Sequence, residues 1–84
     1  MADEKRPERP ALVLHLAAGG DTLTFALPPD DYHDLEQDLR NLLVKGAVRA
    51  VRTKDGASVA INFANVAVAY IDDLQRTGKV FGLH

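Results

Sequence analysis

The chain has 84 residues, of which 46% are hydrophobic and 26% charged, a composition typical of one small globular domain and not of a disordered chain. It contains no cysteine, which excludes disulfide bonds and thiolate metal sites. The net charge of −2 argues against a dedicated polyanion-binding protein, although residues 11–38 carry a charge of −6 and residues 39–84 a charge of +4.

The first ten residues, MADEKRPERP, combine prolines with charges of both signs and predict a disordered leader. The apolar run that follows is short for a signal peptide, and His15 interrupts it. No run approaches the ~18 apolar residues that a membrane span needs. We therefore expect a cytoplasmic protein.

Two strands and a hairpin are predicted next. LVLHL (12–16) alternates leucines with other residues, which is typical of a half-buried strand. AAGGD (17–21) supplies the glycines of a tight reversal, and TLTFAL (22–27) alternates again.

An amphipathic helix is predicted in the segment from Pro28 to Gly46. Prolines and acidic residues suit its first turn, and Lys45 followed by Gly46 is a typical helix end. Its apolar stripe recurs at helical spacing and consists of Tyr32, Leu35, Leu39, Leu42 and Leu43.

A second hairpin is predicted from residues 47–63, with its turn at KDG (54–56). Val48 and Val51 cannot both face inward on a regular strand, so we expect a bulge or a late start there. NFAN (62–65) predicts a short turn held by Asx-type hydrogen bonds before a last strand, VAVAYI (66–71).

The predicted fold class is therefore α+β: an antiparallel sheet of four to five strands in β-β-α-β-β-β order, with one amphipathic helix packed on one face. The predicted organisation is a leader over residues 1–10, a single domain over 11–77 and an apolar tail over 78–84.

The strands have a bulky face, expected under the helix, and a face of small residues. Val66, Val68 and Tyr70 are placed on the bulky face. The other face is either solvated or a contact surface, and its lack of charge favours contact. It is predicted to contain Val13, His15, Thr22, Thr24, Ala26, Ser58, Ala60, Asn62, Ala67, Ala69 and Ile71.

The residues that catalysis needs cannot be assembled from this sequence. Ser58 is the one serine and lies in the second hairpin, and His15 has no assigned partner. TGKVFG (77–82) lacks the spacing of a phosphate-binding loop. We therefore predict a protein that is not an enzyme and that needs no cofactor.

Metal-ligand character is confined to one acidic cluster, which consists of Asp30, Asp31, His33 and Asp34. Asp30 and Asp34 are one helical turn apart, so both can reach a hard cation. Acidic residues also collect at helix N-termini for dipole reasons, and the spacing matches no established metal site. We therefore predict no metal.

A basic set consists of Lys45, Arg49, Arg52 and Lys54. Clustered cations of this kind bind phosphates, which makes a nucleic-acid surface one interpretation. The other is an edge strand kept soluble by its charges, which the scarcity of free aromatic residues and of a second helix favours.

The C-terminal segment carries Val80, Phe81 and Leu83, which are unusual in a free tail. They dock either on the domain's own edge or in a partner by strand addition, and the sequence leaves both open.

These observations predict a small interaction or regulatory module that forms a homodimer and also binds an unidentified protein. A chain this small buries little core of its own, which favours association. The predicted contact residues are Ala67, Ala69, Ile71, Val80, Phe81 and Leu83. The alternative is a nucleic-acid-associated regulator that uses the basic set.

Overall fold

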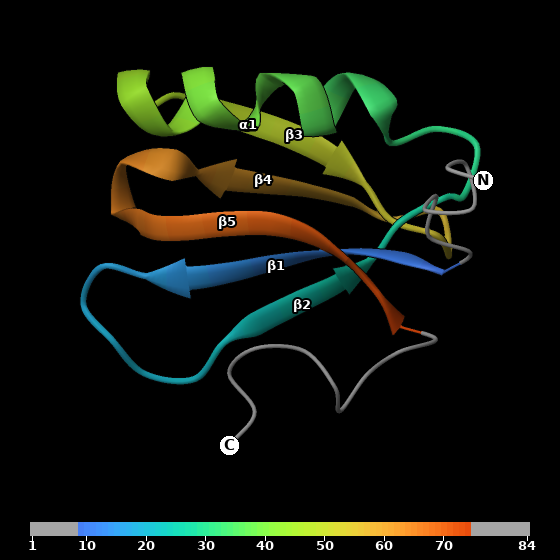
Figure 1. Ribbon diagram of the computed structural model, residues 1–84, viewed down its shortest axis with the longest axis horizontal. Helices are drawn as coiled ribbons and strands as arrows, with labels where there is room; N and C mark the ends of the chain where they lie inside the picture. Colours follow the sequence, from blue (N-terminus) through green and yellow to red (C-terminus); the bar gives the residue numbers. More distant parts are fainter. Residues whose placement is uncertain (1–8, 75–84) are drawn as a thin grey trace, which may run out of the picture.

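The computed structural model describes residues 9–74 (Figure 1), and the predictions for residues 1–8 and 75–84 lie outside them. Each element is short, as expected for a small domain. In chain order the elements are β1 (Pro10–Leu16), β2 (Leu23–Ala26), α1 (His33–Lys45), β3 (Val48–Arg52), β4 (Ser58–Asn62), the short 3-10 helix η2 (Phe63–Asn65) and β5 (Val66–Asp73).

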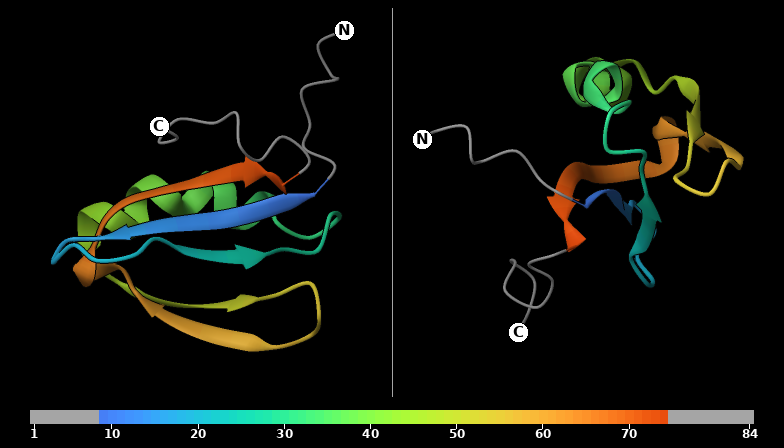
Figure 2. Two further views of the ribbon diagram at one scale, coloured as in Figure 1. Left: turned by 90° about the horizontal axis from the view of Figure 1, so that it is seen from below. Right: turned by 90° about the vertical axis from the view of Figure 1, so that its right-hand side faces the viewer.

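The α+β class, with one helix and antiparallel strands within residues 9–74, is confirmed, but the predicted single sheet is wrong. β1 is the central strand of a three-stranded sheet with the order β2-β1-β5, and β3 and β4 form a separate hairpin. Seen along the strands, the helix, the three-stranded sheet and the hairpin surround a common interior (Figure 2). The two sheets part between β2 and β4.

The helix contributes the predicted stripe to the core. Leu35, Leu39 and Leu42 are buried in it, and Tyr32, which precedes the first turn, is buried as well. The helix ends as the sequence indicates, because Gly46 adopts the left-handed conformation at φ 62°. The amides of Gly46 and Ala47 then bond back to the carbonyls of the last turn, at 3.3 and 3.2 Å.

The hairpin strand β3 is regular, so the bulge expected there is wrong. Its pairing with β4 runs without a shift from Val48 opposite Asn62 to Arg52 opposite Ser58. Val51 therefore faces the core, whereas Val48 points outward and is 67% exposed. An outward valine at a strand end costs little, since scattered exposed hydrophobic residues are common.

The turn at residues 62–65 is confirmed. Phe63 begins η2 and is almost fully buried, and the Asn62 side chain accepts a hydrogen bond from the Ala64 amide at 3.0 Å. This Asx-type bond ends β4 and redirects the chain into β5.

A register shift between His15 and Leu16 interrupts the pairing of β1 with β5. As a consequence, Ala69 lies opposite Leu14 and Ile71 opposite Leu12, on the core side of the sheet. Val68 and Tyr70 lie opposite His15 and Val13, on the outer side. The face assignment made for β5 from the sequence is correct for Val66 and Ala67 but wrong from Val68 onward, because a bulge exchanges the faces that simple alternation predicts.

The two ends of the described segment are joined by hydrogen bonds. β1 begins at Pro10, and the Arg9 amide donates to Asp73 Oδ1 at 3.1 Å. Arg9 also accepts from the Leu74 amide at 2.8 Å, so both ends of the described segment lie side by side. None of the helices within residues 9–74 is long and apolar enough to cross a membrane.

The face assignment of β5 is testable with two truncations. Ile71→Ala removes a side chain packed against the core and is expected to lower the free energy of unfolding by about 1–2 kcal/mol. Val68→Ala truncates an outward side chain and is expected to cost about 0.5 kcal/mol or less. Urea unfolding measures both, and a larger loss from Val68→Ala would contradict the register.

Candidate interaction groove between β2 and β4

The two sheets part between β2 and β4 (Figure 2). An apolar groove lies between these strands. It consists of two adjoining hollows of about 650 and 260 Å³ that share Phe25 and Val59. One hollow extends toward the hairpin turn and the other toward η2. The groove is lined by Leu14, Leu16, Leu23, Thr24, Phe25, Ala26, Thr53, Lys54, Asp55, Ala57, Val59, Ala60, Ile61, Asn62, Asn65 and Val66.

The floor of the groove belongs to the hydrophobic core. Leu14, Ile61 and Val66 are buried core residues, and all three line the hollow beside η2. The walls are partly exposed: Leu23 is 40% exposed, and Phe25 and Val59 are half-buried. The groove is therefore a surface depression with partly exposed apolar walls over a buried apolar floor.

The two strands that flank the groove each have an edge that is not paired within residues 9–74. β2 pairs with β1 on its inner edge, and β4 pairs with β3 on the far side from the groove. At the turn end, the Lys54 amide donates to the Ala26 carbonyl at 2.8 Å and ties the hairpin to β2. Between β2 and β4 themselves, the backbone groups that face the groove are available to another strand.

A polar network shapes the turn at the end of the groove. The Thr53 hydroxyl donates to Asp55 Oδ1 and accepts from the Ala57 amide at 3.1 Å, and the Thr53 amide donates to the Ala57 carbonyl at 2.9 Å. The hydrogen bond from Thr53, followed by one from the Ala57 backbone, lowers the pKa of Asp55 below its ordinary value of 3.8. The turn is thus held by its ionised carboxylate.

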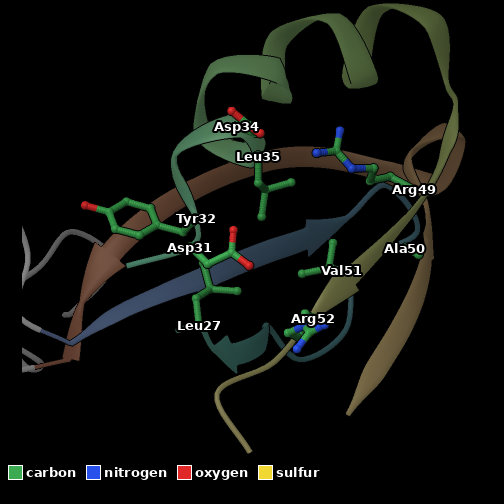
Figure 3. Close-up of a pocket in the computed structure, with 9 residues that line it drawn as sticks. All are labelled: Leu27, Asp31, Tyr32, Asp34, Leu35, Arg49, Ala50, Val51 and Arg52. Carbon is green, nitrogen blue, oxygen red and sulfur yellow. The ribbon is translucent and has the colours of Figure 1, made fainter. Parts of the chain in front are cut away.

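A smaller hollow of about 190 Å³ lies between the start of α1 and β3 (Figure 3). It has charges of both signs, since Asp31 and Asp34 line it together with Arg49 and Arg52. Arg49 forms an ion pair with Asp38 on the helix, with Nη1 3.0 Å from Oδ2. Because two aspartates and two arginines line it, the charges of this hollow balance, and it has no net preference for an anion.

The basic set as a whole does not form one surface, although Arg49 and Arg52 both line the hollow beside α1. Arg49 and Arg52 lie on opposite faces of the regular strand β3, since they are an odd number of residues apart. Lys54 lies in the hairpin turn at one end of the groove between β2 and β4, and Lys45 is at the C-terminal end of the helix. Nucleic-acid binding by this set stays a prediction, and the arrangement adds nothing in its favour.

The predicted contact residues of β5 are divided between the two faces of the sheet and do not form one surface. Ala69 and Ile71 pack against the core, whereas Ala67, next to the register shift, is exposed. On the outer face, the rings of His15 and Tyr70 stack at 5.9 Å. Burial, and then the charge of Asp72, raise the pKa of Tyr70 above 10.0. Val80, Phe81 and Leu83 lie outside the described residues.

The acidic cluster at residues 30–34 is split by the start of the helix. Asp30 and Asp31 lie in the exposed turn before it, and Asp34 is in its first turn. Within residues 9–74, no three side chains of the metal-binding types are close enough to share an ion.

The groove was not predicted from the sequence, although the sequence contains the apolar alternation of the two strands that form it. Leu23 and Phe25 alternate on one strand, and Val59 and Ile61 on another, but nothing local indicates that the two strands fail to pair. Comparison of the chain with protein-family models, with curated proteins and with solved structures found no match.

The pKa of Asp55 provides a test of the turn. Thr53→Val removes the hydroxyl donor and is expected to raise the pKa of Asp55 toward 3.8. Since the folded-state pKa is depressed, the carboxylate stabilises the fold fully above the ordinary value, and this stabilisation is lost as the pH falls through the folded-state pKa. The stability of Thr53→Val should therefore fall less than that of the natural chain as the pH decreases below about 4.

A ¹³C NMR titration of the Asp55 carboxyl group measures the shift. Ser58→Ala is the matched control, because it removes a hydroxyl near the same turn that does not cause the shift. An unchanged pKa in Thr53→Val would contradict the hydrogen-bond network.

Proposed function

We propose that the protein is a small, non-enzymatic interaction module that binds an extended, apolar polypeptide segment in the groove between β2 and β4. The observation that carries this proposal is the row of partly exposed apolar side chains, Leu23, Phe25 and Val59, between two strand edges that are unpaired within residues 9–74. An added strand would bond to these edges through its backbone and place alternate side chains on the apolar floor.

The chemistry of the groove favours a polypeptide over a small polar ligand. The charged residues that line it, Lys54 and Asp55, are both in the turn at one end, and the rest of the lining is apolar or uncharged. Leu23 and Phe25 on β2, and Val59 and Ile61 on β4, point toward the same interior. The expected ligand therefore has apolar residues at every second position.

The homodimer predicted from the sequence stays a prediction. Its proposed contact surface changes, because Ala69 and Ile71 pack inward. The groove, rather than the small residues of β5, is the surface that we propose for protein contacts.

Selection from a library of random peptides about ten residues long, a length that covers a typical strand, tests the proposal. The selected peptides are expected to carry apolar residues at alternate positions. Leu23→Asp, which places a charge in the groove wall, is expected to weaken their binding by at least tenfold, since burying an unpaired charge is costly. Calorimetry or fluorescence anisotropy measures the dissociation constant.

Val68→Asp is the matched control, because Val68 is 48% exposed, similar to Leu23 at 40%, but lies on the outer face of the same sheet. It should leave binding unchanged. Circular dichroism establishes that both variants are folded. Failure to enrich any peptide, or equal weakening by the two variants, would contradict the proposal.

A further inference from the structure

We propose that the groove between β2 and β4 is occupied in cis by the C-terminal segment of the same chain, residues 79–84, which a partner must displace in order to bind. This inference rests on the proposed function and adds its regulation. It is carried by the groove, by the length of chain beyond residue 74 and by the place where the described segment ends.

The described segment ends at the end of the molecule where the groove begins. Asp73 lies opposite Pro10, and Ala11 lies opposite Ala26, so the end of β5 and the end of β2 are at the same end of the sheet. This is also the end at which Lys54 bonds to Ala26 and the larger hollow of the groove begins. A segment that continues from Leu74 therefore starts at the same end of the molecule as the larger hollow of the groove.

The remaining chain is long enough to reach the groove. The path from β5 to the groove crosses β1 and β2. It covers three strand spacings, which is about 14 Å. Residues 75–80 span up to about 20 Å when extended. Val80 and the residues after it can therefore lie between β2 and β4.

The composition of the segment matches the groove. In an extended chain Phe81 and Leu83 project from one face, which suits the apolar floor formed by Leu14, Ile61 and Val66. Gly82 then faces outward, on the same side as the small outward-facing residues of β4. A segment that enters at the turn end runs antiparallel to β2, the more stable pairing.

The short connection favours the same chain over a second copy. A flexible linker of this length gives the segment an effective concentration in the millimolar range, far above the micromolar concentrations at which the protein would be studied. A partner then competes with the segment for the same edges. Its apparent affinity is reduced by the fraction of molecules whose groove is filled.

Disulfide trapping in the full chain tests this placement, because the natural sequence contains no cysteine. The trapping variant combines Gly82→Cys with Ala60→Cys on β4. The control combines Gly82→Cys with Ala50→Cys, since Ala50 lies directly opposite Ala60 on β3, is also exposed and is one strand farther from the groove. The unfolding temperature of each single-cysteine variant is first shown to equal that of the natural chain.

The trapping variant is expected to form an intramolecular disulfide at least tenfold faster than the control, and adding Phe81→Asp should reduce its rate to that of the control. Equal rates in the two double-cysteine variants would overturn the inference. Disulfide-linked dimers as the main product would also overturn it, and would place the segment of a second copy in the groove.

The regulatory part is tested with the peptides selected above. In the full chain that carries Phe81→Asp and Leu83→Asp, they should bind at least tenfold more tightly, as expected if the segment fills the groove in about nine of ten molecules. Unchanged affinity would overturn the competition. If the disulfide forms but no peptide binds, the proposed function is refuted and the cis placement stands. If peptides bind but the disulfide does not form, the cis placement is refuted and the proposed function stands.

Discussion

The hairpin β3–β4 is attached to the rest of the domain at its two ends, and the other features of the molecule depend on this arrangement. At one end, the Lys54 amide donates to the Ala26 carbonyl at 2.8 Å. At the other end, the Ala17 amide donates to the carbonyl of Asn65 in η2 at 2.9 Å, and Phe63 anchors η2 in the core. Between these attachments β2 and β4 are not paired with each other, so the strands form two sheets with an apolar groove between them.

This arrangement distributes the core over three walls. The helix contributes its leucine stripe, the three-stranded sheet contributes Leu12 and Leu14, and the hairpin contributes Val51 and Ile61. A single 13-residue helix is too small to cover five strands, so the hairpin turns away from the plane of β1 and closes the remaining side. The groove between β2 and β4 is the place where this closure is incomplete.

Features that depend on neighbouring residues were predictable from the sequence. The helix stripe, the Gly46 end and the Asn62 turn each follow from the period or the capping chemistry of a few adjacent residues. Features that depend on pairing between distant segments were not. The register shift between His15 and Leu16 reverses the faces of β5 from Val68 onward, so the prediction from alternation that Ala69 and Ile71 point outward was wrong.

The candidate site was hidden for the same reason. Each wall of the groove reads as an ordinary half-buried strand, and only the failure of β2 to pair with β4 makes the four apolar side chains between them a surface. The basic residues show the same dependence on strand geometry. The alternation of β3 directs Arg49 toward Asp38 on the helix and Arg52 to the other face.

The central claim is that an extended apolar segment, the chain's own C-terminus, completes the core between β2 and β4. The most direct measurement is a methyl-to-aromatic NOE experiment on the full chain at a concentration where light scattering shows a monomer. The account predicts NOEs from the methyl groups of Leu23 and Val59 to the ring protons of Phe81. Direct NOEs between Leu23 and Val59 without any to Phe81 would contradict it, because they would mean that the two strands close upon each other.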